Sequence, residues 1–364
     1  MTSIFIRLLT AFCLVWGGAA SAHAATIEQM AGQMIVLGFK GNEADDPAVI
    51  KLREEIAAGR LGGVMLLKTN VKSLDAVTKM NAAFRAASPE LLPFITVDQE
   101  GGAVERLTEA VGFREIPNAA AIAANNTPAQ AQAIYSTMAA SLAELGFTVN
   151  FGPVADVNIN SKNPIIAKFG RAFSADPAVV ALYDAAFIKA HHAAGMLTAL
   201  KHFPGHGSST GDSHDGFVDI TKTWQPEELD PYRALIAAGD VDMVMVGHLY
   251  HADYSDADAQ TPASLSPQWI TDVLRDKLGF DGVVISDDLE MGAIRVHFTI
   301  QQVVVQSVRA GMDVLLFSNT AKYHASLGQE ILDILVAEAK ADPDFAARIE
   351  QSYNRIVALK GAIR

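Results

Sequence analysis

The chain has 364 residues, of which 50% are hydrophobic and 19% are charged, so a large core is available and wholesale disorder is excluded. Its 28 Lys and Arg against 41 Asp and Glu give a formal net charge of −13, which argues against binding to nucleic acid or anionic membranes. At about 150 residues per domain the length suggests two domains, although α/β barrels exceed that size as single units.

The first 24 residues are typical of an export signal peptide. Arg7 supplies a positive start, residues 8–15 are apolar, and Ala22-His23-Ala24 forms a small-x-small cleavage site. The apolar run is shorter than the ~20 residues that a membrane span needs. We therefore predict a signal peptide over 1–24, a mature chain over 25–364 without a transmembrane segment, and a periplasmic or secreted location.

Eight short apolar runs, rich in β-branched residues, recur along the mature chain with helical segments between them. They cover 34–39, 63–67, 93–97, 148–151, 198–200, 243–246, 283–286 and 313–317. Continuous apolar runs are typical of a parallel sheet that is buried on both faces. Eight strand–helix repeats favour a closed barrel over an open doubly wound sheet, so we predict an α/β fold, a single (β/α)8 TIM-like barrel.

The connections between these runs carry helix boundaries. Segments 127–146, 225–239 and 266–279 each begin with a polar residue followed by proline, and each ends on glycine. Proline at the first helical position and glycine after the last are typical of helix ends. The tail over 342–364 is expected to form a closing helix.

Polar side chains gather directly after six of the eight predicted strands. They are Asp98-Gln99-Glu100-Gly101-Gly102, Asp156, Lys201-His202, His248, Asp287-Asp288 and Ser318-Asn319. Barrels of this type build their active site at the C-terminal ends of the strands. Each residue alone could be a helix cap or a satisfied loop group, but the set together indicates a site.

The segment 201–215 combines glycines and serines with three histidines and two aspartates. Asp212 and His214 lie two residues apart, so in a turn or an extended loop their side chains could pair, and a carboxylate stabilises an imidazolium. This describes a general acid/base, with a solvated surface loop as the alternative. Asp287 stands at the end of a buried run, where it is either a helix cap or a carboxylate nucleophile. The nearby proton donor and the lack of a cysteine or serine elbow favour the nucleophile.

Together these motifs resemble glycoside hydrolase family 3, and within it the single-domain β-N-acetylglucosaminidases. The matching segments are 98–102 with Arg106-Leu107, Gly152-Pro153-Val154-Ala155-Asp156, Gly170-Arg171-Ala172-Phe173-Ser174, the loop from Lys201 to His214, and Gly279-Phe280-Asp281-Gly282-Val283-Val284 leading to Ser286-Asp287-Asp288-Leu289. The similarity covers essentially the whole mature chain, which the resemblance implies is one catalytic barrel over 25–364.

The resemblance implies a retaining double displacement on terminal N-acetylglucosamine of peptidoglycan-derived or chitin-type oligosaccharides. Asp287 would form the glycosyl-enzyme intermediate, and His214, oriented by Asp212, would protonate the leaving oxygen and then activate water. The residues implied to hold the terminal sugar are Asp98, Arg106, Arg171, Lys201 and His202. Glu100 is expected to be structural.

Three features depart from the family pattern. Ala103 stands where arginine is frequent, and Glu290-Met291-Gly292 lacks the usual small residue before methionine. Both lie beside the site and are expected to affect the subsite of the leaving sugar. The predicted export also differs from the cytoplasmic enzymes that recycle peptidoglycan fragments, and would bring this chain to intact wall glycan or chitin oligosaccharides.

Three other functions are compatible with parts of the pattern. A metal-dependent barrel hydrolase would draw its ligands from His202, His206, Asp212, His214, His248 and Asp287. The chain has no HxH after the first strand and no HExxH helix, and its only cysteine, Cys13, lies in the predicted signal peptide. The other two are an inactive glycan-binding barrel and a phosphorylase, in which phosphate resolves the intermediate. We expect no cofactor, no metal, a glycan substrate and a monomer.

Overall fold

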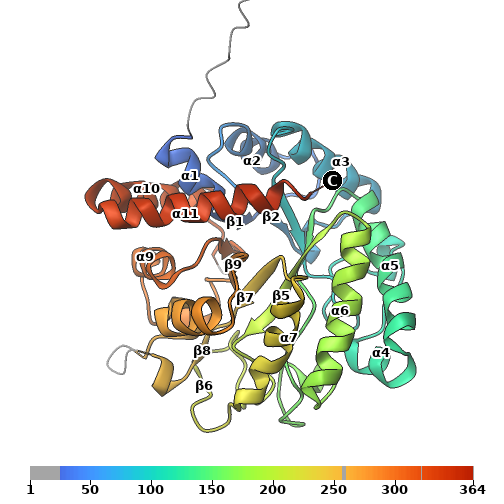
Figure 1. The fold of residues 1–364 in the computed structure, drawn as a ribbon. Helices are drawn as coiled ribbons and strands as arrows, with labels where there is room; N and C mark the ends of the chain where they lie inside the picture. The colour runs from blue at the N-terminus through green and yellow to red at the C-terminus, as the bar shows by residue number, and fades with distance from the viewer. Residues whose placement is uncertain (1–24, 256–259, 321, 364) are drawn as a thin grey trace, which may run out of the picture.

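The computed structural model describes residues 25–255, 260–320 and 322–363, so the predicted signal peptide lies outside the described residues. Eight parallel strands form one sheet that curls into a barrel (Figure 1), which confirms the predicted fold class. In spatial order they are β10 (Leu315–Phe317), β1 (Ile35–Gly38), β2 (Gly63–Leu66), β3 (Phe94–Val97), β4 (Val149–Asn150), β5 (Leu197–Phe203), β7 (Met243–Val246) and β9 (Val283–Ser286). A parallel bridge between Ile285 and Val314 joins the two ends of the sheet.

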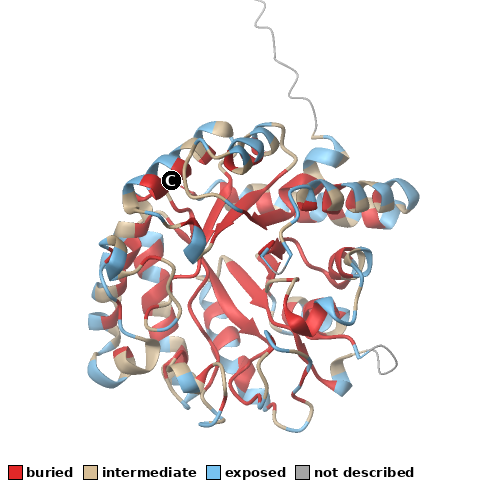
Figure 2. Cartoon of the chain, turned by 180° about the vertical axis from the view of Figure 1, so that it is seen from behind, coloured by how far each residue is buried: buried red, intermediate tan, exposed pale blue. Residues whose placement is uncertain are grey.

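Every predicted apolar run overlaps one of these strands, and all the barrel strands are buried along their whole length. Figure 2 shows the buried strands at the centre, enclosed by helices that turn their exposed faces outward. The end of β5 was predicted wrongly. β5 continues to Phe203, so Lys201 and His202 lie within the strand and not after it. These polar residues continue the strand because their side chains find charged partners at the barrel mouth, which the apolar pattern does not reveal.

Helices form the outer layer of the barrel. They are α1 (Ile27–Gln33), α2 (Pro47–Ala57), α3 (Leu74–Ala87), α4 (Ala119–Asn125), α5 (Pro128–Glu144), α6 (Pro177–Ala193), α7 (Asp230–Ala238), the π-helix η7 (Gln268–Lys277), α8 (Gly292–Arg295), α9 (Ile300–Ala310), α10 (Leu327–Ala341) and α11 (Pro343–Lys360). Short 3-10 turns are η1 (Lys68–Asn70), η2 (Glu109–Val111), η3 (Ala167–Phe169), η4 (Pro226–Leu229), η5 (Ala252–Tyr254) and η6 (Ala263–Leu265).

The predicted helix boundaries are largely confirmed. Helix α5 begins with a capping box in which Thr127 and Gln130 satisfy each other's backbone N–H groups, and Pro128 occupies its first turn. The segment 225–239 divides into the turn η4 followed by α7. The segment 266–279 is wound as a π-helix, with Trp269 among the side chains it buries. Propensity and capping signals do not distinguish this winding from an α-helix.

A second, two-stranded parallel sheet lies next to the barrel strand β7. It pairs β6 (Val218–Asp219) with β8 (Leu249–Tyr250), and only two residues lie between the end of β7 and the start of β8. Since β7 ends at the C-terminal edge of the barrel, this small sheet belongs to the face on which the polar residues gather.

Helix α11 (Pro343–Lys360) lies within the tail that was predicted to form a closing helix, and a buried carboxylate ties this helix to the barrel. Asp313, just before β10, accepts hydrogen bonds from Arg275 at 2.6 Å, Arg348 at 2.7 Å and the Ser352 hydroxyl at 2.9 Å. Two of these donors belong to α11, so the barrel's last strand and its closing helix are held by one fully buried group. Within the described part of the chain, no helix is long and apolar enough to cross a membrane.

Candidate active site

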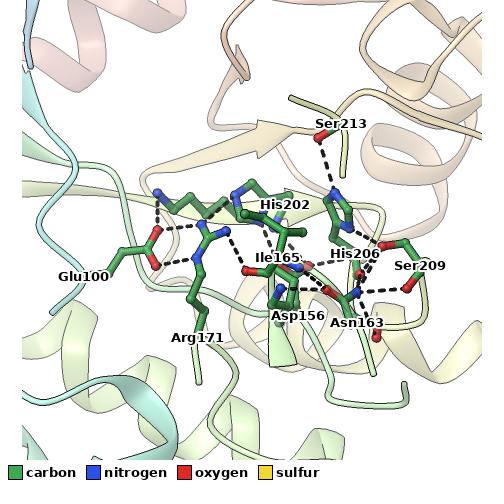
Figure 3. A network of polar contacts seen from close by, with 12 residues as sticks. Glu100, Asp156, Asn163, Ile165, Arg171, His202, His206, Ser209 and Ser213 are labelled. Carbon is green, nitrogen blue, oxygen red and sulfur yellow. Dashed lines mark hydrogen bonds and ion pairs between the residues drawn. The ribbon is translucent and has the colours of Figure 1, made fainter. Parts of the chain in front are cut away.

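The C-terminal ends of β3 and β5 carry a buried network of opposite charges. The Lys201 ammonium lies 2.8 Å from an Asp98 oxygen and 2.7 Å from a Glu100 oxygen. Arg171 binds both oxygens of Glu100, at 2.8 and 2.9 Å, as Figure 3 shows. Arg106 donates to the second oxygen of Asp98 at 2.8 Å. The structure therefore brings together four of the five residues that the sequence predicted to hold the sugar, and adds Glu100 between the two buried cations.

The pKa shifts of Asp98, Glu100, Arg171 and Lys201 all favour the ionised form of each group. Burial raises the pKa of Asp98, but Lys201 and Arg106 outweigh burial and lower it overall. The same balance, with Arg171 and Lys201 as the cations, holds the pKa of Glu100 far below its ordinary value. Burial lowers the pKa of Lys201, and the two carboxylates more than reverse this shift. The site therefore presents fixed charged donors and acceptors to a ligand.

His202, the fifth predicted sugar-binding residue, lies next to Arg171 and is oriented by a buried aspartate. Its Nδ1 lies 2.7 Å from Asp156 Oδ2, and its Nε2 lies 3.3 Å from the Arg171 guanidinium. The ionised carboxylate of Asp156 can only accept, so His202 Nδ1 carries a proton and donates it to Asp156 in a hydrogen bond. Asp156 is fully buried, and its other oxygen accepts the backbone N–H of His206 at 2.7 Å (Figure 3). Asp156 was predicted to lie after a strand, but its role as the partner of His202 was not predicted.

The loop after β5 carries the predicted acid/base pair. His214 Nδ1 lies 2.7 Å from Asp212 Oδ1, which also accepts the His214 backbone N–H at 2.9 Å. Burial raises the pKa of Asp212, but these two hydrogen bonds lower it overall, so Asp212 is an ionised acceptor. Because Nδ1–H is used for Asp212, Nε2 is the nitrogen available for proton transfer. The His214 side chain is 60% exposed, so a substrate can reach it.

Asp287 and Asp288 follow β9 directly, and their surroundings give them different properties. Burial raises the pKa of Asp287, but the imidazoles of three histidines (His202, His248 and His214) lower it to about 2. Asp288 Oδ1 accepts the backbone N–H groups of Ser318 at 2.9 Å and Glu290 at 3.1 Å. Burial raises the pKa of Asp288. Asp287 is thus the ionised carboxylate near the acid/base pair, and Asp288 fixes the backbone around it.

His248 binds the backbone of the turn that carries Asp287 and Asp288. This role was not predicted from the sequence. Its Nε2 lies 2.9 Å from the backbone oxygen of Asp288, and its Nδ1 lies 2.7 Å from the Ser264 hydroxyl. A carbonyl oxygen only accepts, so Nε2 carries the proton. Burial lowers the pKa of His248, and its ring holds the backbone next to Asp287. Its position after β7 was the only signal, and its two partners come from distant segments.

Two groups of contacts anchor the acid/base loop. At its root, the Asn163 amide donates to the backbone oxygens of His206 at 2.8 Å and Ser209 at 3.1 Å. At its tip, the N–H of Gly292, the first residue of α8, donates to the His214 backbone oxygen at 3.2 Å. A Cβ at position 292 would lie 2.6 Å from that oxygen, so the close approach requires glycine. One of the three predicted departures from the family pattern, Glu290-Met291-Gly292, thus contacts the acid/base loop.

The residues proposed as metal ligands are bound to other protein groups. His206 lies 2.6 Å from the Ser209 hydroxyl through Nδ1, and burial lowers its pKa to about 4. His202, His214 and His248 have the partners described above. Over residues 25–255, 260–320 and 322–363, no three His, Cys, Asp or Glu side chains are grouped so that they could hold a metal ion.

The sequence of this chain is similar to those of a known family and of its members. Residues 26–359 match the family described as Glycosyl hydrolase family 3 N terminal domain. The Beta-hexosaminidase of Stenotrophomonas maltophilia (strain R551-3) is 38% identical over 292 residues, which cover 78% of this chain and 82% of that protein.

Two solved structures are also similar. The glycoside hydrolase family 3 beta-N-acetylglucosaminidase from Paenibacillus sp. str. FPU-7 has a TM-score of 0.83 and 32% identity, covering 93% of this chain and 63% of that one. This chain therefore spans less than two thirds of that protein. The Beta-N-acetylhexosaminidase from Beutenbergia cavernae DSM 12333 has a TM-score of 0.81 and 31% identity, covering 93% of this chain and 99% of that one.

The barrel, its charged mouth and these similarities define a glycoside hydrolase. Since the family match extends over most of its length, the chain belongs to glycosyl hydrolase family 3.

Glu228, beneath the acid/base loop, gives a prediction about stability and pH. It is fully buried, accepts the backbone N–H groups of Ser208 at 3.2 Å and Gln225 at 3.1 Å, and burial raises its pKa from 4.5 to about 7. Because the folded state binds this proton more tightly, stability falls as pH rises from 4.5 through 7. Glu228→Gln should remove this loss, worth about 3 kcal/mol at pH 8 relative to pH 4.5.

The measurement is urea unfolding of the wild type and the variant at intervals between pH 4.5 and 8. Glu227→Gln, which changes an exposed carboxyl on the same turn, is the matched control and should keep the wild-type slope. A Glu228→Gln variant whose stability follows the wild type in parallel across this range would show that the buried carboxyl does not take up a proton on folding.

Proposed function

We propose that this protein is a retaining β-N-acetylhexosaminidase that removes terminal N-acetylglucosamine from oligosaccharides. The observation that carries the proposal is the placement of the ionised Asp287 near an exposed imidazole that a second carboxylate orients. The names of the similar proteins, a beta-hexosaminidase, a beta-N-acetylglucosaminidase and a beta-N-acetylhexosaminidase, support the same sugar.

In the first step, an Asp287 oxygen attacks the anomeric carbon and the bond from that carbon to the leaving oxygen breaks. His214 Nε2 gives its proton to the leaving oxygen, so the leaving group departs as a neutral alcohol. The imidazolium is stabilised by ionised Asp212, 2.7 Å away. Its neutral form then takes a proton from water, whose oxygen attacks the same carbon and frees Asp287. Two displacements at one carbon retain its configuration.

Asp98, Arg106, Arg171, Lys201 and His202 are proposed to hold the sugar. Carboxylate oxygens of Asp98 accept from sugar hydroxyls, whereas the ammonium and guanidinium groups donate to sugar oxygens. Because the cations are buried and bound to Glu100 and Asp98, they keep one geometry and lose little conformational freedom when the substrate arrives. Glu100 is a positioning residue in this scheme.

We further propose that the protein is exported and acts as a monomer. The pattern of residues 1–24 supports export, and all the proposed site residues come from one chain. Fractionation of cells that express the full-length chain and sedimentation of the mature protein test the two statements. A protein that stays full-length in the cytoplasm contradicts export, and a stable dimer contradicts the monomer.

Replacing the proposed nucleophile should abolish turnover and allow chemical rescue. Asp287→Ala should lower kcat by about 10³-fold or more on a chromogenic N-acetyl-β-glucosaminide, because no covalent intermediate can form. Azide occupies the space of the lost carboxylate and should restore turnover as a glycosyl azide of inverted configuration. Asp288→Ala is the matched control, and azide should restore no activity to it.

Full activity in Asp287→Ala would refute the assigned nucleophile. Assays with and without inorganic phosphate identify the acceptor, since a sugar phosphate as the main product would identify a phosphorylase. Activity removed by a chelator and restored by a metal would support a metal-dependent hydrolase instead.

Replacing the acid/base should affect substrates according to their leaving groups. His214→Ala should lower kcat/KM by about 10²- to 10⁴-fold on substrates with poor leaving groups such as alkyl alcohols. It should lower kcat/KM much less for a nitrophenolate, which needs no protonation. The comparison is measured as the slope of log(kcat/KM) against the pKa of the leaving group, which should become steeper. An unchanged slope would show that another group donates the proton.

A further inference from the structure

An exposed phenylalanine lies close to the proposed acid/base in the sequence. Within the described residues, the exposed large apolar side chains are Ile50, Ile159, Leu182, Phe217 and Val296. Phe217 follows His214 by three residues and is 38% exposed, and Val296 is 65% exposed next to His297. The rings of Phe217 and His297 contact each other, with centroids 6.1 Å apart. Phe217 and Val296 therefore lie in two segments that meet at this ring contact.

The ring of Phe217 is held firmly. It packs against Tyr250 with centroids 5.2 Å apart and a tilt of 39° between the rings. Phe217 directly precedes β6, which pairs with β8, the strand that contains Tyr250. An aromatic ring that is packed against another ring beside a paired strand loses little conformational freedom when it binds a ligand.

This aromatic cluster is also joined to the tip of the acid/base loop. The N–H groups of Gly292 and Ala293 donate to the backbone oxygens of His214 and Ser213, each at 3.2 Å. Helix α8, which begins at Gly292, leads directly to His297. The backbone of His214 is therefore bonded to the start of the segment that leads to His297, and His214 is three residues from Phe217. The group that His214 protonates is the leaving group, so the leaving group must lie near this place.

We propose that Phe217 and His297 form the binding surface for the leaving-group sugar, with the pyranose ring of that sugar packed on the exposed face of Phe217. This inference rests on the proposed function. A pyranose ring has one face of C–H groups, which is apolar enough to cover an exposed aromatic ring, and His297 offers a polar edge to its hydroxyls. The surface favours a leaving group that is itself a sugar ring over a small alcohol.

The test compares a disaccharide with a substrate whose leaving group has no ring. N,N′-diacetylchitobiose and N-acetyl-β-glucosaminyl fluoride share the terminal sugar and differ in the leaving group. In Phe217→Ala the ratio of kcat/KM for the disaccharide to kcat/KM for the fluoride should fall about 3- to 10-fold, the size of an aromatic contact. Phe217→Tyr should keep the wild-type ratio, because it keeps the ring.

Leu182→Ala is the matched control, because it removes a large exposed apolar side chain from helix α6, and it should leave the ratio as in the wild type. An unchanged ratio in Phe217→Ala, with the wild type cleaving both substrates, would overturn the binding surface and leave the proposed function intact. If Phe217→Ala does not fold, a lower ratio in His297→Ala supports the surface and an unchanged one overturns it. A wild type that cleaves neither substrate overturns both proposals.

Discussion

The structure of the barrel mouth requires that several charged side chains are buried and that each of them has a partner of opposite charge. Moving one ion out of water costs several kcal/mol, and attraction to a partner offsets this cost only when the geometry is good. Lys201 and Arg171 meet this condition by sharing Glu100, while Lys201 also binds Asp98. The shared carboxylate joins the end of β3, the loop after β4 and the strand β5 at one point. Removing Glu100 would therefore leave two buried cations with fewer partners and loosen three segments at once.

The same pairing of histidine with aspartate occurs twice in the site and has opposite consequences. His202 is 8% exposed and bound to the fully buried Asp156, so one tautomer and one orientation are fixed. His214 is 60% exposed on a loop, bound to an aspartate that the same loop provides. A buried pair suits the binding of a ligand in one pose, whereas an exposed pair suits proton exchange with substrate and water. Exposure, and not the type of residue, separates the two proposed roles.

The sequence predicted most of the fold because continuous apolar runs and proline–glycine helix ends are local signals. The end of β5 was predicted too early, because Lys201 and His202 are tolerated in a buried strand only through partners from the segments that follow β3 and β4. The predicted sugar-binding residues lie together, as strand-end positions in a barrel require. Asp156 had no predicted role, Glu100 was expected only to be structural, and His248 entered only as a candidate metal ligand. Their contacts are with residues far away in sequence, which local patterns do not reveal.

The two adjacent aspartates that follow β9 differ in their hydrogen-bond partners. Asp288 accepts two backbone N–H groups, and Asp287 accepts only the N–H of Asp288 among the hydrogen bonds found for its side chain in the described structure. A carboxylate bound to backbone donors is held in place and is less available to attack a carbon. A carboxylate near imidazoles stays ionised and keeps free lone pairs for attack on a carbon. His248 reinforces the difference because it binds the backbone of Asp288 and its ring also lowers the pKa of Asp287. The partners of each carboxylate therefore distinguish Asp287, the proposed nucleophile, from Asp288, which holds the backbone of the turn in place.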